Sequence, residues 1–429
     1  MTLRLVVLLG VSAIALAIVA LPWLPGAPVV GYAALFIGSS VLFLVLAPAI
    51  LRASLSGRQL AGLLALLFLL RAAFLVSTPI GSDDFHRYLW DGRVQAAGLN
   101  PYRYAPGAPE LQPLHTETLP RLVNHPTLKT PYFPLAEWTF RLAYGLSGES
   151  VWGIKLLVLL AEALTVAGLW LLLGQLGRPP SHVLLYAAAP LAVFQFAIDA
   201  HVDAIGFPFL VFGLLLHLRG WKTTGLVLLA LSMSVKPVAA VVLPLFFLRA
   251  RGWRERLAVP LVPVLVLGLQ FAPYLVDPGV FDGLFTFARR WRFNGAVFSV
   301  LHATLGDNLP SRLISAGLFT TVLCVLSVRS RDVAVTSVYA VLLLLLFSPV
   351  VHPWYVGWLA VVAPLAPRPS SLALVGAVSL TSLTVVTYQL DGVWVDYGPV
   401  RAAQYLPVVA LLVWEAAARQ RAARVSLPG

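Results

Sequence analysis

Apolar segments of about 20 residues follow one another along almost the whole chain, and they restrict the fold more than any other feature. The 429 residues are 59% hydrophobic and only 11% charged, and the mean hydropathy is +0.86. A soluble core does not need so much apolar surface, whereas a bundle of membrane-spanning helices does. The sequence therefore predicts an all-α integral membrane protein, a polytopic helical bundle of about 13–14 spans or half-spans.

The apolar segments indicate a single transmembrane domain over residues 1–429. Spans are predicted at about 3–22, 29–50, 60–79, 152–173, 182–198, 203–218, 256–275, 311–328, 334–349, 354–366, 371–389 and 402–417. The run 223–248 is interrupted by the letters VKP, so we predict a broken or re-entrant pair of half-helices there. Two long loops, 80–150 and 276–310, lie between the spans.

Basic residues recur in alternate loops, such as RASLSGR (52–58) and RARGWRER (249–256). Because basic loops stay in the cytoplasm, we expect both termini inside and the two long loops outside a bacterial cell membrane. The net charge of +12 follows this pattern, which argues against nucleic acid as a partner. The outer segment ARRWRFNG (288–295) is basic without a topological reason, which indicates an anionic ligand.

The stretch GSDDFHRYLWDG (81–92) places many charges where the chain leaves the third predicted span. Ser82 suits an N-cap and Gly98 a C′ position, so we predict a helix of about 15 residues between them, with its apolar face in the membrane interface. Asp83 and Asp84 are candidate catalytic bases that accept a proton from a hydroxyl group. Three further residues on this helix are candidates for orienting the base or the substrate: His86, Arg87 and Asp91. The alternative is a capped interfacial helix whose charges only pair with one another.

Two sets of basic residues are candidates for binding the phosphate of a donor. Lys236 lies deep in its apolar run, where a lysine is costly, and Pro237 breaks the helix beside it. We interpret Lys236 as a cation for a phosphate or a buried carboxylate, the alternative being a structural ion pair with Glu162. In ARRWRFNG, arginines are interspersed with aromatic residues, and the guanidinium group of arginine can bind a phosphate through two parallel hydrogen bonds. The alternative is that these arginines contact anionic lipid headgroups. These arginines are Arg289, Arg290 and Arg292.

The segment IDAHVDAIG (198–206) offers polar groups at an outer turn, namely Asp199, His201 and Asp203. We favour contacts to substrate hydroxyls or a solvated cap, and retain Asp199 and Asp203 as weaker candidate ligands of a divalent cation. No other cofactor is indicated, since P-loop, GxGxxG, CxxC and HExxH motifs are absent from the sequence. His352 precedes a proline at another outer break and is a candidate ligand contact or an interfacial anchor.

The order of these motifs resembles that of the GT-C class of integral-membrane glycosyltransferases, particularly the polyprenol-phosphate-mannose-dependent mannosyltransferases. The elements that carry the resemblance are SDDFHRYLWDG, GLNPYRYAP, YFPLAEW, DAHVDAIGF, SVKPVAAVVLP and SPVVHPWY. They are spread over about residues 60–366, and GPI mannosyltransferase I catalytic subunits show a comparable succession.

The resemblance implies an inverting enzyme that moves a sugar, with mannose as the best assignment, from a polyprenyl-phosphate donor. The acceptor would be a hydroxyl group of a lipid, a glycan or a protein on the outer face of the membrane. In the family an aspartate of the first outer loop acts as the base, which corresponds to Asp83 or Asp84, with Asp83 favoured as the first of the pair. The resemblance also maps the carrier phosphate onto Lys236, with Arg289, Arg290 and Arg292 as less well-matched helpers. Tyr102, in GLNPYRYAP, is a further candidate for binding or orienting the substrate. Two other functions stay open, a transporter or flippase of lipid-linked sugars and a non-catalytic glycolipid-binding subunit.

Overall fold

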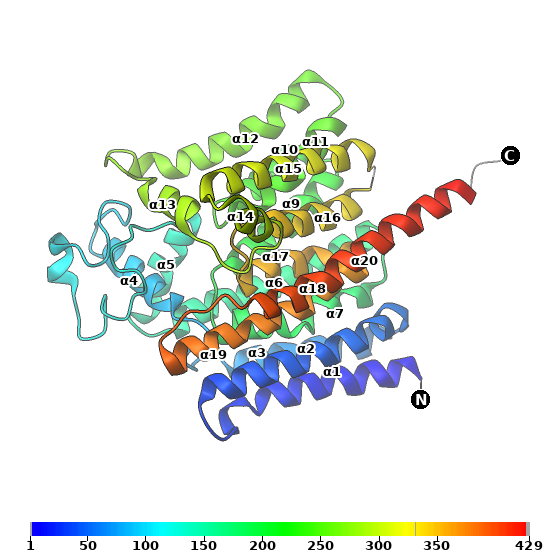
Figure 1. Cartoon of the computed structure of the whole chain (residues 1–429), viewed down its shortest axis with the longest axis horizontal. Coiled ribbons are helices and arrows are strands. Elements are labelled where there is room, and N and C mark those ends of the chain that lie inside the picture. The colour runs from blue at the N-terminus through cyan, green and yellow to red at the C-terminus, as the bar shows by residue number, and fades with distance from the viewer. Residues whose placement is uncertain (1, 331, 426–429) are drawn as a thin grey trace.

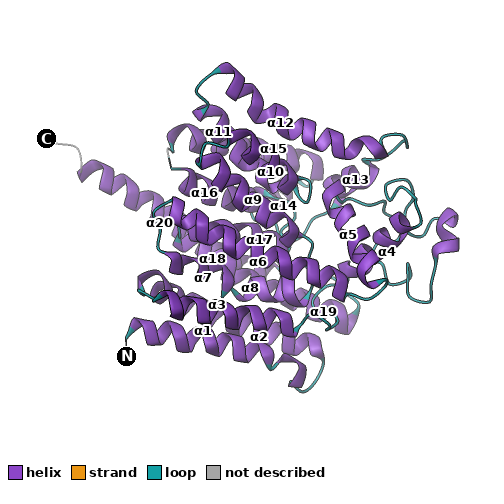
Figure 2. Ribbon diagram, turned by 180° about the vertical axis from the view of Figure 1, so that it is seen from behind, coloured by secondary structure: helices purple, strands orange, loops and turns teal. Residues whose placement is uncertain are grey.

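Helices arranged roughly side by side form the body of the molecule in the computed structural model, which describes residues 2–330 and 332–425 (Figure 1). Within these ranges no strand is formed, and the segments between helices are turns and loops (Figure 2). Six helices are long and apolar enough to cross a membrane, or seven if one bent pair counts as a span. The predicted all-α, multi-pass membrane fold is therefore confirmed.

The six long spans are α2 (Pro28–Arg52), α6 (Trp152–Gln175), α12 with its 3-10 extension (Trp253–Tyr274), α15 (Asn308–Arg329), α18 to α19 (Pro369–Asp391) and α20 (Gly398–Val425). Shorter helices complete the bundle: α1 (Leu3–Val19), α3 (Gly57–Ala73), α9 (Asp203–Leu218), α10 (Lys222–Met233), α11 (Leu243–Arg249), α14 (Val297–Leu305), α16 (Val333–Phe347) and α17 (Pro353–Val362). Their apolar side chains form one large buried cluster that runs through the whole bundle.

Two segments are broken helices because proline removes a backbone donor and forces the preceding residue out of the helical region. The span predicted at 182–198 is present as a bent pair, in which α7 (Leu184–Ala187) and α8 (Pro190–Ala192) belong to two pieces at an angle of 54°. The predicted interruption at VKP is present, with Lys236 between α10 and α11. Lys222 Nζ, at the start of α10, lies 2.5 Å from Glu255 Oε1 at the start of α12, so the chain returns to the side where α10 begins after passing through Lys236.

The first long loop contains α4 (Asp84–Ala96) and α5 (Pro134–Ser147), which pack against each other at one end of the bundle (Figure 1). A Cβ atom on Gly92 would lie 2.4 Å from the backbone oxygen of Phe140, so this close contact requires glycine. Gly98 follows the helix at φ +78°, as predicted for a C′ residue. The N-cap is Asp83 rather than Ser82, whose hydroxyl instead accepts a hydrogen bond from Asp84 N at 3.2 Å.

The apolar face of α4 does not lie open to the membrane interface, contrary to the prediction. Its large side chains are buried against α5, α6 and the loop between α4 and α5; they are Phe85, Tyr88, Leu89 and Trp90, none more than 8% exposed. Burial on this side removes rotational freedom from the helix. The acidic residues at its first turn are consequently held in a fixed position.

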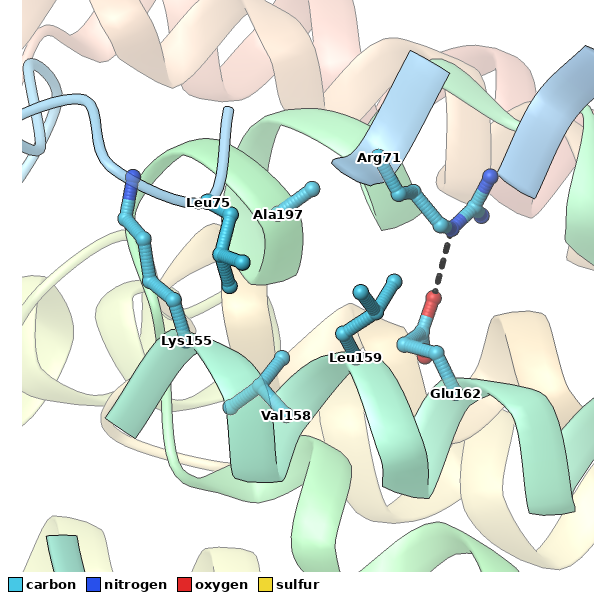
Figure 3. A pocket seen from close by; sticks show the side chains of 7 residues that line it. All are labelled: Arg71, Leu75, Lys155, Val158, Leu159, Glu162 and Ala197. Atoms are coloured by element: carbon cyan, nitrogen blue, oxygen red, sulfur yellow. Dashed lines mark hydrogen bonds and ion pairs between the residues drawn. The ribbon is translucent and has the colours of Figure 1, made fainter. Parts of the chain in front are cut away.

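A buried ion pair holds α3 against α6 (Figure 3). Arg71 Nε lies 3.1 Å from Glu162 Oε2, and both side chains are at most 2% exposed. Tyr186 also donates a hydrogen bond to Glu162. A cavity of about 10 Å³, the size of one water molecule, lies between this pair and Lys155. The alternative pairing of Glu162 with Lys236 is therefore wrong.

Removing one member of this pair leaves an uncompensated buried charge, so we expect Arg71→Leu to lower the free energy of unfolding by about 3–5 kcal/mol. The double variant Arg71→Leu/Glu162→Leu should be more stable than Arg71→Leu, because neither charge remains buried. Thermal unfolding of the purified variants in detergent measures both effects. A double variant less stable than either single variant would contradict this interpretation.

Candidate active site

The turn between η4 (Val193–Ile198) and α9 organises the site. Asp199 Oδ1 accepts hydrogen bonds from the backbone amides of Ile80 at 3.1 Å and Gly81 at 2.8 Å, and its Oδ2 accepts one from the Tyr32 hydroxyl at 2.5 Å. Asp199 thus fixes the chain just before α4. The next residue, Ala200, takes φ +61°, a conformation that is costly for alanine and reverses the chain. His201 consequently points toward α4, while Asp199 holds the segment that leads into it.

Asp84 is the acidic residue that faces His201. Its Oδ2 lies 3.8 Å from His201 Nδ1, and its Oδ1 accepts a hydrogen bond from Asn124 Nδ2 at 2.8 Å. The same amide nitrogen donates to Asp83 Oδ1 at 2.9 Å, so Asn124 bridges the two carboxylates. The Asp84 side chain is 22% exposed, whereas that of His201 is fully buried. A group entering from solvent therefore reaches Asp84 but not the imidazole behind it.

The environment of Asp84 suits proton transfer near neutral pH. Burial raises its pKa to about 6, with a further contribution from the charge of Asp83. The Asn124 hydrogen bond and the positive charge of Lys236 act in the opposite direction. A carboxylate with this pKa is ionised at pH 7 and is a stronger base than an exposed aspartate.

Lys236 approaches the same turn from the other side. Its Nζ lies 2.6 Å from Asp203 Oδ1, which also accepts a hydrogen bond from Trp358 Nε1 at 2.7 Å. The ammonium group sits 3.6 Å from the centroid of the Tyr355 ring, a cation–π contact. The Lys236 side chain is 21% exposed and that of Asp203 only 4%. Lys236 thus has the buried carboxylate partner that its position predicted, and one side of its ammonium group stays accessible.

A stack of aromatic rings connects this turn to the rim of the site. The Trp354 indole lies between two imidazoles, with ring centroids 3.8 Å from His201 and 4.4 Å from His352. His352 in turn stacks on Phe293 at 4.8 Å. Two buried nitrogens in this stack, His201 Nε2 and His352 Nδ1, have no hydrogen-bond partner among the described residues.

The three arginines of the second long loop lie at the exposed rim, at the end of α13 (Asp282–Arg290) and just after it. Arg292 contacts His302, and Arg289 lies 5.9 Å from the Phe285 ring centroid. Phe293 follows directly and packs on His352, so this rim adjoins the aromatic stack. Arg289, Arg290 and Arg292 make no contact with Lys236 or Asp84 in the structure.

Four other candidate residues brace the first long loop. Arg87 Nε pairs with Asp91 Oδ2 at 2.7 Å, and Arg87 Nη1 donates to the Leu128 backbone oxygen at 2.9 Å, so both side chains face protein. The Tyr102 hydroxyl donates to the Tyr132 backbone oxygen at 3.0 Å, and its ring is 2% exposed. His86 packs on Phe85, and burial lowers the pKa of its imidazole.

The two weaker metal candidates do not converge on one point, since Asp199 is surrounded by hydrogen-bond donors and Asp203 pairs with Lys236. Among the residues that the structure describes, no group of three or more His, Cys, Asp or Glu side chains is placed to hold a metal ion.

Comparisons with known proteins identify the relatives of this fold and site. A family model described as "Alpha-(1->6)-mannopyranosyltransferase, N-terminal domain" matches residues 19–251, more than half of the chain. The chain belongs to this family. The GT-C mannosyltransferase resemblance drawn from the motif order is therefore confirmed, and the protein is a membrane glycosyltransferase.

Two curated members of the alpha-(1->6)-mannopyranosyltransferase family show the extent of the similarity. Alpha-(1->6)-mannopyranosyltransferase A of Mycobacterium tuberculosis is 27% identical over 365 residues, covering 75% of this chain and 68% of that protein. The Corynebacterium glutamicum protein of the same name is 25% identical over 187 residues, covering 42% of this chain and 36% of that protein. The crystal structure of ArnT from Cupriavidus metallidurans bound to undecaprenyl phosphate has a similar fold, with a TM-score of 0.50, 18% identity, and coverage of 83% of this chain and 71% of that one.

Several residues of this glycosyltransferase site carry no signal in the sequence. Asn124 lies in an irregular loop about which neither periodicity nor a motif says anything. Trp354, Tyr355 and Trp358 stand beside His352 in a span where aromatic residues are ordinary. Only the one-turn spacing of Tyr355 and Trp358 indicates that these two share a helix face.

Proposed function

We propose that this protein transfers a mannosyl group from a polyprenyl-phosphate donor to a hydroxyl group of a glycan, with Asp84 as the general base and Lys236 as the cation for the departing phosphate. One observation carries the proposal: a carboxylate and an ammonium group from distant segments meet around one turn. His201 lies 3.8 Å from Asp84, and Asp203, two residues later, lies 2.6 Å from Lys236.

The proposed reaction requires one proton transfer and one displacement. The acceptor oxygen attacks C1 of the donor sugar while its proton passes to the Asp84 carboxylate. As the new bond forms on one face of C1, the bond between C1 and the phosphate oxygen breaks on the opposite face, so this single displacement inverts the configuration at C1. The phosphate leaves as an anion and needs no proton. Lys236 stabilises the charge that develops on this leaving group. Asp83 shares Asn124 with Asp84 but lies outside the first turn of α4, which favours Asp84 as the base.

The substrates follow from the relatives and from the charges of the site. The names of the curated relatives specify a mannopyranosyl group in an alpha-(1->6) linkage, which supports mannose as the sugar and the 6-hydroxyl of a hexose as the acceptor. ArnT was crystallised with undecaprenyl phosphate, which supports a lipid-phosphate donor. Arg289, Arg290 and Arg292 at the rim are suited to attract such an anion before it reaches Lys236.

We place this chemistry on the outer face of the membrane, with both termini in the cytoplasm. The basic loops between spans support this orientation. Asp84 and Lys236 both belong to the end of the bundle that carries α4 and α5, opposite the ion pair between Lys222 and Glu255 (Figure 1). A polyprenyl tail in the bilayer would present its phosphate at this end.

The proposal is tested by mass spectrometry of envelope glycans and glycolipids from cells with and without the gene. We expect glycans from the deletion strain to lack hexose units in alpha-(1->6) linkage, and the polyprenyl-phosphate-linked mannose to accumulate. Complementation with Asp84→Asn should not restore the glycans. An unchanged glycan profile in the deletion strain would rule out the proposed activity.

The acid limb of the pH profile should report Asp84. Because the base must be ionised and its pKa is raised to about 6, kcat/KM should fall as the pH drops through about 6 and level off above it. Initial rates across a buffer series with intact vesicles give this curve. A limb centred near pH 4, the value for an ordinary carboxyl group, would contradict the buried environment assigned to Asp84.

Asn124 is proposed as the residue that positions the base. Asn124→Ala removes a hydrogen bond that lowers the pKa of Asp84, so its acid limb should move to higher pH. We expect kcat/KM to fall about tenfold near pH 6 and to recover at alkaline pH. Asn100→Ala is the matched control, because Asn100 lies in the same loop but donates its hydrogen bond to Asp277, at 2.9 Å, and not to Asp83 or Asp84. A loss of activity that is equal at all pH values would mean that Asn124 is only structural.

A further inference from the structure

Two exposed aromatic rings stand at the rim of the site, outside the segment 19–251 that the family model matches. Trp394 is 44% exposed and Tyr388 is 39% exposed, and their ring centroids lie 5.5 Å apart at an interplanar angle of 72°. They come from the end of α19 and the loop that follows it. Exposed tryptophan is common at membrane interfaces, so its function here depends on its neighbours.

The Trp394 ring lies next to the aromatic stack that leads to the base. Its centroid lies 5.0 Å from that of Phe293 and 6.1 Å from that of His352. From His352 the stack passes through Trp354 to His201, whose Nδ1 is 3.8 Å from Asp84. Two rings therefore separate Trp394 from His201. This spacing places Trp394 beyond the reacting hydroxyl, where the next sugar units of an oligosaccharide would lie.

The segment that carries Trp394 is fixed on the side of the site. The Thr384 hydroxyl donates to the Val395 backbone oxygen at 2.7 Å, and Asp396 accepts hydrogen bonds from Asn294 N at 3.2 Å and Arg401 Nη1 at 2.9 Å. On the other side Gln389, next to Tyr388, donates to the Ile80 backbone oxygen at 2.5 Å, just before α4. A side chain that only anchored the protein in lipid would not need this positioning relative to the base.

We propose that Trp394, with Tyr388 beside it, is a stacking platform for a sugar unit of the acceptor, one or two units away from the hydroxyl group that Asp84 activates. A pyranose ring presents C–H groups on one face, and these pack on the electron-rich face of an aromatic ring. The inference rests on the proposed function and deepens it: the acceptor is an oligosaccharide that is recognised over several units. Asp396 and Arg401 supply polar groups next to the platform for the sugar hydroxyls.

The dependence of KM on acceptor length tests this proposal. Wild-type protein in vesicles receives polyprenyl-phosphate mannose and either methyl α-mannoside or α-(1->6)-linked mannotriose. Trp394→Leu should raise the KM for mannotriose about tenfold and leave the KM for methyl mannoside and the donor unchanged. Trp394→Phe, which keeps an aromatic face, should retain most of the affinity for mannotriose.

Trp23→Leu is the matched control for anchoring in the membrane. Trp23 is 74% exposed and lies in the connection between α1 and α2, at the same end of the bundle as α19 (Figure 1). If this variant raised the KM for mannotriose as much as Trp394→Leu, the rings would be lipid anchors and the platform would be refuted. An equal loss for both acceptors, or no loss for mannotriose, would also refute it.

Binding without turnover separates the platform from the proposed reaction. Saturation-transfer NMR of mannotriose with the purified protein, in the absence of donor, should show contact that Trp394→Leu abolishes. If wild-type protein bound mannotriose through Trp394 but transferred no sugar, the proposed function would fail and the platform would stand. If the protein transferred mannose at a rate that did not depend on Trp394, the proposed function would stand and the platform would fail. If wild-type protein neither bound mannotriose nor transferred mannose, both proposals would fail.

Discussion

Asp84→Asn should lower kcat for mannosyl transfer roughly 10²- to 10⁴-fold, the usual contribution of a general base. The asparagine has the same shape and still accepts the hydrogen bond from Asn124, so only the capacity to take a proton is lost. Asp83→Asn should lower kcat by less than about tenfold, because Asp83 influences the base through its charge and through Asn124. Radiolabelled transfer with purified variants in vesicles measures both rates.

The comparison of the two variants decides which acid is the base. Equal thermal midpoints of the two variants and the wild type would show that neither loss is due to misfolding. If Asp83→Asn abolished transfer and Asp84→Asn did not, the roles assigned to the two carboxylates would have to be exchanged. Full activity in the double variant would eliminate both as bases.

Lys236→Met should reduce kcat/KM about 10²- to 10³-fold, the usual effect of removing one group that stabilises developing charge. Part of any loss has a second origin, because the variant leaves Asp203 buried without its ionic partner. The double variant Lys236→Met/Asp203→Asn removes this penalty while Trp358 keeps an acceptor. We therefore expect the double variant to regain thermal stability without regaining activity.

Lys236→Arg completes the series, since it retains the charge but not the compact ammonium group. It should keep a measurable part of the activity, with the largest change in the KM for the donor. Recovery of full transfer in Lys236→Met/Asp203→Asn would show that Lys236 serves only to neutralise Asp203. The donor phosphate would then have to bind elsewhere, for example at Arg289, Arg290 or Arg292.

The membrane-spanning helices were predictable because each one carries its own signal, a stretch of apolar residues long enough to cross the bilayer. The predicted span 203–218 coincides with α9 (Asp203–Leu218), and the interruption at Lys236 was visible from its lysine and proline. The division of 182–198 into two bent pieces was not predicted. Apolar composition alone does not distinguish a continuous helix from one that Pro190 redirects at depth.

The site was predictable only where a residue is unusual in its local setting. A lysine within an apolar run and an acidic pair at a membrane exit are such residues, and the fold brings them to the same turn. Helical spacing also placed Arg87 and Asp91 on one face with Asp84, but their side chains face Leu128 and α5 rather than the site. Periodicity specifies a face of a helix and not the part of the protein that covers it.

Asn124 and Trp394 depend on contacts between distant segments, which a single sequence does not reveal. Asn124 meets the acidic pair from 40 residues away, and Trp394 meets Phe293 and His352 from another loop. Neither asparagine nor tryptophan is unusual in the loops of a membrane protein. The path of the chain in three dimensions is what gives each of them a place at the site.

The central claim is that Asp84 activates a sugar hydroxyl for attack on a lipid-phosphate-linked mannose. Its most direct test is NMR and mass analysis of the product formed by the purified protein in vesicles from polyprenyl-phosphate mannose and α-(1->6)-mannotriose. We expect a tetrasaccharide with one new α-(1->6) bond, inverted at C1 relative to a β-linked donor, and formation from Asp84→Asn slower by a factor of about 10² or more. Movement of the donor between leaflets with no new glycosidic bond, or equal product from Asp84→Asn, would contradict the claim.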